Sequence, residues 1–284
     1  MKDTIFNSKI TLNCQGNLHE FDNPIIMGII NTTPDSFFEG SRVYSIDSII
    51  SQVQRFINEG VDIIDIGGYS SRPGADDVSE KEELNRILPA IKSIKEKFPK
   101  LLISIDTFRT HVAQESLKIG ANIINDISGG QNNESIYKVA AHFSAPYIMM
   151  HMRGTPQNMQ NNTHYKNLLK DLIFFFSNQI KIAQKNGIKD IIIDPGLGFS
   201  KTLDQNYEIL SKISLLNVLN KPILIGLSRK SMLYNLLKNT ANDCLNATTI
   251  ANTIALMNGA NILRVHDINE AVEIKKIMTK IKRY

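Results

Sequence analysis

Chemically active side chains stand directly after short apolar runs at several places in the chain. Asp106, Asn125 and Asp194 supply carboxylate and amide groups, and Arg264 supplies a guanidinium. A solvated loop would explain any one of them but explains all four poorly, because a charge beside the end of a buried strand needs a partner. His266 follows Arg264 by two residues, so both can point from one face of an extended segment at the same anion. These residues are candidates for a binding site.

The apolar runs that precede these residues predict the elements that position them. The run 25–30 is apolar on both faces, as in a parallel strand that is covered on both sides. We expect strands over 25–30, 61–66, 101–105, 122–124, 146–150, 190–193, 222–225 and 261–263. Helical periodicity between them predicts helices that include 46–58, 79–97, 111–119, 165–186 and 247–258.

Eight successive strand–helix units predict an α/β fold, a (β/α)8 TIM barrel, in which the ends of the strands form one rim. The stretch 4–21 alternates around Gln15-Gly16 and predicts an N-terminal β-hairpin. We expect the whole chain, 1–284, to form a single domain. A doubly wound open sheet is the alternative.

Composition excludes several classes of function. The chain has 284 residues, 42% of them apolar, and a net charge of +4 without a basic run, so we expect no nucleic-acid partner. Nothing approaches the ~20 apolar residues of a membrane span, and no apolar signal segment follows Met1. The two cysteines, Cys14 and Cys244, have no metal or redox spacing. The expected location is a reducing cytoplasm.

Two motifs carry a resemblance to a known family. Residues 26–40, IMGIINTTPDSFFEG, and residues 62–74, DIIDIGGYSSRPG, resemble the two signature stretches of the dihydropteroate synthase family. The resemblance continues in the family's order at 104–108, 124–129, 150–156, 193–199, 226–231 and 264–267. It implies a pterin-binding TIM barrel and a transferase of folate biosynthesis, EC 2.5.1.15. The implied reaction joins 6-hydroxymethyl-7,8-dihydropterin diphosphate to p-aminobenzoate, giving 7,8-dihydropteroate and pyrophosphate by an SN1-like loss of pyrophosphate.

The resemblance also implies roles for particular residues, Mg²⁺ as cofactor, a homodimer, and membership of a class of sulfonamide targets; it leaves sulfonamide sensitivity open. Its catalytic residues are Arg72, Lys230, Arg264 and His266. The pterin site is Asp106, Asn125, Met150, Asp194 and Lys230; the diphosphate site is Ser71, Arg72, Arg264 and His266; the p-aminobenzoate site is Phe37, Pro73, Phe199 and Ser231. Asn31 is the implied Mg²⁺ ligand. The donor and acceptor groups of a pterin suit carboxylates, an amide and a lysine, and arginine suits phosphate.

Several alternatives stay open at this level. Met150 can equally be a core residue, and either Phe37 or Phe38 can face the site. Thr32, Ser71 and Ser200 depart from the family's usual residues, which leaves substrate and inhibitor affinity open. A pterin-dependent methyltransferase shares the carboxylate and asparagine positions but has no use for the two signature loops. A non-catalytic pterin-binding protein does not need the residues assigned to the diphosphate.

Overall fold

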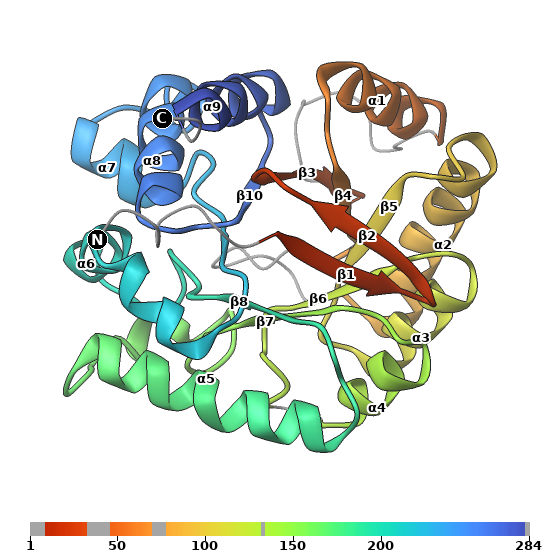
Figure 1. Cartoon of the computed structure of the whole chain (residues 1–284), viewed down its shortest axis with the longest axis horizontal. Helices are drawn as coiled ribbons and strands as arrows, with labels where there is room; N and C mark the ends of the chain where they lie inside the picture. Colours follow the sequence, from red (N-terminus) through yellow and green to blue (C-terminus); the bar gives the residue numbers. More distant parts are fainter. Residues whose placement is uncertain (1–8, 33–45, 70–77, 132–133, 282–284) are drawn as a thin grey trace.

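Eight parallel strands run in chain order around a closed barrel (Figure 1). The computed structural model describes residues 9–32, 46–69, 78–131 and 134–281. Neighbouring strands pair in the order β8-β7-β6-β5-β4-β3-β10-β9, and a parallel bridge from Ile193 to Ile223 joins the two ends. This closure confirms the predicted (β/α)8 barrel and rejects the open sheet. The barrel strands are β3 (Ile25–Asn31), β4 (Ile63–Gly67), β5 (Leu102–Asp106), β6 (Ile123–Asp126), β7 (Tyr147–Met150), β8 (Ile191–Asp194), β9 (Leu224–Ile225) and β10 (Ile262–Val265).

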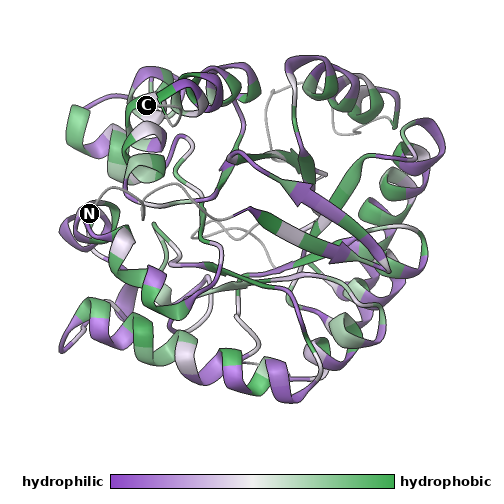
Figure 2. Cartoon of the chain, in the orientation of Figure 1, coloured by the Kyte–Doolittle hydropathy of each residue, from purple (hydrophilic) through white to green (hydrophobic). Residues whose placement is uncertain are grey.

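Helices surround the barrel, with their apolar faces toward the strands and their polar faces outward (Figure 2). In α1, Ile49, Val53 and Phe56 form the buried stripe that a helical period of 3.6 predicts. Gly28 of β3 allows α1 to come close, because a Cβ at this position would lie 2.8 Å from the Phe56 ring. The helices are α1 (Ile46–Glu59), α2 (Glu80–Lys97), α3 (Thr110–Lys118), α4 (Ser135–His142), α5 (Leu168–Lys185), α6 (Leu203–Ser211), α7 (Ser231–Leu237), α8 (Leu245–Met257) and α9 (Ile268–Ile281), with short 3-10 turns η1 (Met159–Asn161) and η2 (Ile213–Leu219).

The antiparallel hairpin of β1 (Ile10–Cys14) and β2 (Asn17–Phe21) closes the amino-terminal mouth of the barrel (Figure 1). Its turn is Gln15-Gly16, as predicted, and both residues have positive φ. Ile10, Leu12 and Cys14 form an apolar cluster with the first residues of the barrel strands. The backbone N–H of Asn13 donates to Asp190 Oδ2 at 2.8 Å. Residues 4–8 of the predicted hairpin lie outside the described residues.

The expected boundaries differ from the observed ones by a few residues, for local reasons. The helix expected over 165–186 begins at Leu168, because Asn167 is extended and its side chain accepts the N–H of Lys170. The strand expected over 222–225 is only Leu224–Ile225. No helix within the described ranges is both long and apolar enough to cross a membrane.

Candidate active site

The barrel brings the predicted polar residues to its carboxyl rim. Asp106 ends β5 and stands in register with Gly67 of β4 and with Asn125 of β6. Asp194 ends β8 beside Met150 of β7. Arg264 lies in β10, the last barrel strand along the chain. The rim therefore gathers the predicted polar residues of four strands, β5, β6, β8 and β10, that are far apart in sequence, as the fold predicts.

Arg264 is the centre of a buried ionic cluster on this rim. Its Nε donates to Asp65 Oδ2 at 2.6 Å, and its Nη2 donates to Asp106 Oδ2 at 2.7 Å. The same Asp65 oxygen accepts a second N–H, from the side-chain amide of Asn125 at 3.0 Å. Asp65 is fully buried, so a single carboxylate orients both the guanidinium and the amide.

Sequence reasoning missed Asp65. It lies inside the apolar run 61–66, where a strand covered on both faces has no place for an unpaired carboxylate. A carboxylate inside an otherwise apolar run was the sequence signal that could have identified Asp65 as a site residue. Its partner Arg264 comes from β10, almost two hundred positions later in the chain, so only the closed barrel shows the pairing.

Burial shapes the charge state of the cluster. It raises the pKa of Asp106 to about 7, against the opposing pull of the Arg264 guanidinium. Burial also opposes the charge on Arg264, but Asp65 and Asp106 outweigh it and raise the pKa of Arg264. Arg264 therefore stays cationic, whereas Asp106 can gain or lose a proton near neutral pH, as functional carboxyl groups often do.

Asp194 and Lys230 form the second charged part of the rim. Asp194 Oδ1 accepts the backbone N–H of Gly196 at 2.7 Å, and Lys230 Nζ donates to the carbonyl of Leu197 at 2.5 Å. Burial raises the pKa of Asp194, and Lys230 opposes this. Burial lowers the pKa of Lys230 to about 8, and Asp194 opposes this in turn. The Lys230 ammonium lies 4.8 Å from the centre of the Phe199 ring, a cation–π distance.

His266 and Ser231 follow the ends of β10 and β9, where the chain leaves the rim for α9 and α7. The backbone N–H of His266 donates to Ser228 Oγ at 3.2 Å, and its ring Nδ1 lies 3.0 Å from the same oxygen. Buried Ser228 thus sets the orientation of the imidazole, a role that the sequence did not suggest. Ser231 is the first residue of α7, directly after Lys230.

Met150 belongs to an apolar cluster at this end of the barrel. It packs with Ile127, Met152 and Met159, and the rings of Phe108 and Phe199 pack against this group. Because Phe199 packs against this cluster, Met150 is both a buried core residue and part of the apolar surface next to the polar rim residues.

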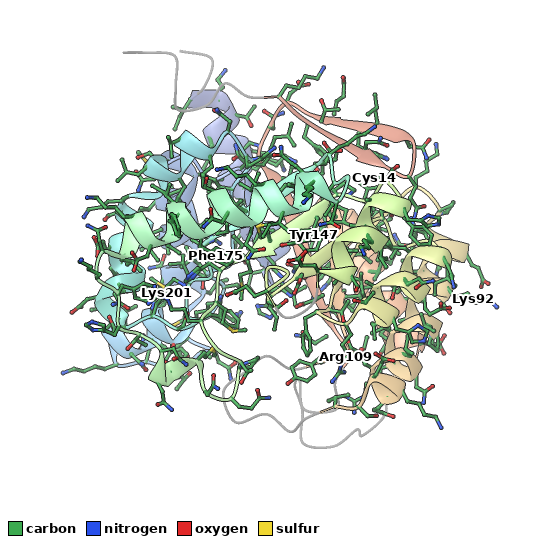
Figure 3. All side chains as sticks on the ribbon, turned by 90° about the horizontal axis from the view of Figure 1, so that it is seen from below. Cys14, Lys92, Arg109, Tyr147, Phe175 and Lys201 are labelled. Atoms are coloured by element: carbon green, nitrogen blue, oxygen red, sulfur yellow. The ribbon has the colours of Figure 1, made fainter. Side chains whose placement is uncertain are left out.

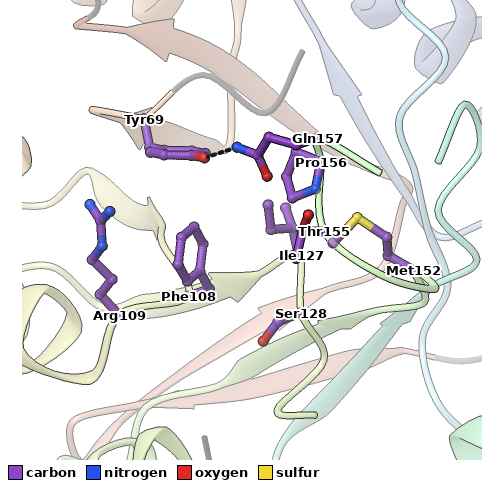
Figure 4. A pocket seen from close by; sticks show the side chains of 9 residues that line it. All are labelled: Tyr69, Phe108, Arg109, Ile127, Ser128, Met152, Thr155, Pro156 and Gln157. Carbon is purple, nitrogen blue, oxygen red and sulfur yellow. Dashed lines mark hydrogen bonds between the residues drawn. The ribbon is translucent and has the colours of Figure 1, made fainter. Parts of the chain in front are cut away.

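A cavity of about 440 Å³ opens next to this cluster (Figure 4). It shares Ile127 and Met152 with the apolar cluster, and the hydroxyl of Tyr69 accepts a hydrogen bond from Gln157 Nε2 at 2.9 Å across it. The cavity is lined by Tyr69, Phe108, Arg109, Ile127, Ser128, Met152, Thr155, Pro156 and Gln157. The charged residues of the rim stand beside this cavity and do not line it.

The remaining predicted residues belong to the first two loops of the rim. Asn31 ends β3 opposite Gly67. Thr32, one of the departures from the family's usual residues, is buried and donates its hydroxyl to the Gly67 carbonyl at 3.0 Å, which ties β3 to β4. The other predicted residues of these loops, Phe37, Ser71, Arg72 and Pro73, lie outside the described residues, as does Phe38.

Comparison with known proteins agrees with this geometry. The profile of the pterin binding enzyme family matches residues 27–266. A dihydropteroate synthase of Synechocystis is 42% identical over 261 residues, which cover 91% of this chain and 90% of that protein. The chain belongs to the dihydropteroate synthase family. Its activity is that of the family, EC 2.5.1.15, a transfer reaction of folate biosynthesis.

Solved structures of the family share the whole fold. The Yersinia pestis dihydropteroate synthase in complex with a sulfonamide drug is 37% identical and superposes with a TM-score of 0.90, covering 96% of this chain and 99% of that one. A Xanthomonas albilineans dihydropteroate synthase with 4-aminobenzoic acid is 31% identical with the same TM-score, covering 98% of this chain and all of that one. Family membership also rejects the methyltransferase alternative.

Proposed function

We propose that this rim condenses 6-hydroxymethyl-7,8-dihydropterin diphosphate with p-aminobenzoate. The observation that carries the proposal is the joint presence of three acceptor groups and two partly buried cations on one rim. The acceptors are Asp106, Asn125 and Asp194, and the cations are Lys230 and Arg264. A pterin ring needs the acceptors, and a diphosphate leaving group needs the cations.

The pterin ring takes the buried acceptors and Lys230. The 2-amino group and the adjacent ring N–H form a donor pair that Asp194 accepts with its carboxylate. Lys230 donates to the ring carbonyl, while Asn125 and Asp106 take the remaining edge of the ring. Met150, from the apolar cluster that reaches Phe199, covers one face of the ring.

The diphosphate takes the cationic side of the rim. Asp65 and Asp106 hold two N–H groups of the Arg264 fork, and a guanidinium carries five. Its other N–H groups can meet phosphate oxygens, together with His266, whose imidazole Ser228 orients. Ser71 and Arg72, outside the described residues, complete this part of the proposal.

The reaction needs charge stabilisation more than proton transfer. The bond between the exocyclic carbon and the diphosphate oxygen breaks, and its electron pair leaves with the diphosphate. The electron-rich pterin ring spreads the positive charge at carbon, while Arg264 and His266 stabilise the departing anion, the largest kind of catalytic contribution. The neutral amine of p-aminobenzoate then forms the new C–N bond and loses its proton to water.

p-Aminobenzoate takes the apolar and hydroxylic groups beside Lys230. Phe199 supplies a ring face, and Ser231 supplies a hydroxyl at the start of α7, which suits an aromatic carboxylate. Phe37 and Pro73 are assigned to the same subsite. The 4-aminobenzoic acid in the Xanthomonas relative supports this substrate class.

A magnesium ion fits this site as a companion of the diphosphate. Within the described ranges no group of His, Cys, Asp and Glu side chains is arranged to hold a metal by itself. Asn31, at the end of β3, offers one hard amide oxygen, and Mg²⁺ commonly keeps waters and takes substrate phosphate oxygens. Bound in this way, Mg²⁺ would supply charge neutralisation on the leaving group.

The test separates the two ends of the pterin substrate. His266→Ala is expected to weaken binding of the diphosphate ester, in the presence of Mg²⁺, by about 1.5–3 kcal/mol, the usual size for a hydrogen bond to a charged group. Binding of unphosphorylated 6-hydroxymethylpterin should change little. Isothermal titration measures both, with exposed His111→Ala in α3 as the control. Equal losses for the two ligands would remove His266 from the diphosphate site.

We also propose a homodimer, formed through α7 and α8. Ile250, Ile254 and Met257 form an exposed apolar stripe on α8, and Leu236 and Leu237 of α7 are half exposed nearby. A contiguous apolar surface of this kind is typical of an interface.

The two cysteines are free and buried, which supports a cytoplasmic location.

Light scattering after size exclusion tests the dimer. The wild-type chain should have a molar mass of twice 31.9 kDa. Ile254→Glu should reduce it to the mass of one chain, because burying the unpaired glutamate charge in an apolar interface carries a large desolvation penalty. Phe174→Glu is the matched control, since Phe174 is an exposed apolar residue of α5, away from α8 (Figure 1). A dimer that persists in Ile254→Glu would place the interface elsewhere.

A further inference from the structure

A lysine is buried behind the pterin side of the rim. Lys201 follows Ser200 at the end of the loop that begins after Asp194, and only 4% of its surface is exposed. It lies on the same side of the molecule as Phe175 of α5 (Figure 3). The reaction described above does not use it.

The Lys201 ammonium holds together two segments that carry site residues. Its Nζ lies 3.0 Å from the carbonyl oxygen of Gly196 and 2.9 Å from that of Phe199, both in the loop after β8. On the other side it lies 3.1 Å from Nδ1 of His151 and 3.4 Å from the His151 carbonyl oxygen, directly after β7.

Each of these partners is linked to a predicted substrate contact. The N–H of Gly196 is the donor to Asp194 Oδ1, and the ring of Phe199 lies under Lys230. Gly196 also approaches His151 so closely that a Cβ there would lie 2.2 Å from the His151 carbonyl oxygen. Lys201 spans this close approach.

A positive charge on Lys201 costs free energy in this buried position. Burial lowers the pKa of Lys201 to about 7, against the favourable field of Asp194. Burial, with Lys201 and Arg153, also lowers the pKa of His151, so the imidazole is neutral and its Nδ1 can accept the lysine N–H. Removing a lysine ammonium from water is costly, and its hydrogen bonds to carbonyl oxygens offset only part of that cost. Its presence indicates a gain of another kind.

We propose that Lys201 is a positioning residue of the active site. By tying Gly196 and Phe199 to His151, it fixes the Asp194 carboxylate against the pterin and the Phe199 ring against p-aminobenzoate. The inference rests on the proposed roles of Asp194 and Phe199.

The neighbouring Ser200 holds the same loop from its other side. Ser200 is fully buried and has a φ of +48°, a conformation that explains why glycine is usual here. In this chain its hydroxyl accepts the backbone N–H of Arg153 at 3.0 Å, and its carbonyl accepts the hydroxyl of Tyr165 at 3.0 Å. The loop is therefore tied to the segment after β7 at two adjacent residues.

Lys201→Met tests the proposal, with Lys95→Met as a matched control. Lys95 is also partly buried and donates to the Leu101 carbonyl at 2.7 Å and to Asn122 at 3.0 Å, but at the amino ends of β5 and β6, away from the rim. Both variants should lower the thermal midpoint. Only Lys201→Met should weaken binding of 6-hydroxymethylpterin, by about tenfold to a hundredfold, the usual effect of a misplaced binding group. Its KM for both substrates should rise more than its kcat falls.

Wild-type pterin affinity and wild-type KM values in Lys201→Met would overturn the proposal. If that variant does not fold, Lys201→Gln, which keeps two N–H donors, is measured in the same way. The role of Asp194 is checked separately with Asp194→Asn. Loss of pterin binding in Asp194→Asn but not in the Lys201 variants would reject the positioning role alone, whereas unchanged binding in Asp194→Asn would reject the pterin assignment itself.

Discussion

Arg264→Met is expected to lower the free energy of unfolding by about 3–5 kcal/mol at pH 8, as the loss of one partner of a buried ion pair does. The substitution leaves two carboxylates, on Asp65 and Asp106, without their shared cation. Asp65 is fully buried, so water cannot replace the guanidinium. Urea unfolding followed by circular dichroism measures the loss.

The free energy of unfolding of the same variant should depend more steeply on pH than that of the wild-type chain. Burial already raises the pKa of Asp106 to about 7, and loss of Arg264 raises it further. Above about pH 7 the native wild-type chain has released the Asp106 proton, whereas the native variant still holds it, so the variant loses stability relative to wild type as pH rises. The deficit of Arg264→Met should therefore shrink toward pH 5. Adding Asp106→Asn should restore part of the stability at pH 8.

A control for charge loss alone is available in Arg229→Met. Arg229 makes a bidentate pair with Asp267 at 3.0 and 2.7 Å, but this pair contains no fully buried carboxylate such as Asp65. Its loss should cost about 1 kcal/mol or less, as for other exposed pairs, and should not steepen the pH dependence. Equal deficits in the two arginine variants, independent of pH, would contradict the buried cluster as described.

Asp194→Asn is expected to weaken pterin binding by about 3 kcal/mol or more, with little change in the fold. An amide keeps the oxygen that accepts the N–H of Gly196, so the loop after β8 should stay in place. It cannot accept the donor pair of the pterin at both positions, because one of its atoms is itself a donor, and a bound ligand would have a buried N–H unpaired. Titration with 6-hydroxymethylpterin measures the loss.

Asp190→Asn provides the matched control at the opposite end of the same strand. Asp190 accepts the backbone N–H of Asn13 from the hairpin, next to the start of β8. Its replacement should affect the attachment of the hairpin and leave pterin affinity unchanged. If Asp194→Asn binds the pterin as the wild-type chain does, the carboxylate does not recognise the ring.

The strands and their ends could be predicted because local chemistry determines them. A run such as 25–30 is apolar on both faces, and its change to Asn31 marks the rim without any knowledge of the fold. The individual rim residues Asp106, Asn125, Asp194 and Arg264 followed from the same rule. The structure agrees because strand ends in a parallel barrel must meet.

The supporting residues could not be predicted, because their partners are distant in sequence. The role of Asp65 depends on its hydrogen bonds with Arg264 and Asn125, and the role of Ser228 on its contact with His266. Nothing in the local sequence sets Lys201 apart from other lysines, although the fold encloses it among carbonyl oxygens. Periodicity assigns a residue to a face or an end, but it does not say which strand lies next to it.

The hairpin that closes the amino-terminal mouth has a consequence for how the chain is made. Its apolar residues Ile10, Leu12 and Cys14 are covered by residues that extend along the chain as far as Ile262. The hairpin precedes every barrel strand in the chain, so its apolar face cannot be fully covered until β10 has been synthesised. During translation the hairpin therefore keeps part of its apolar face uncovered while the strands and helices that follow it in the chain are made.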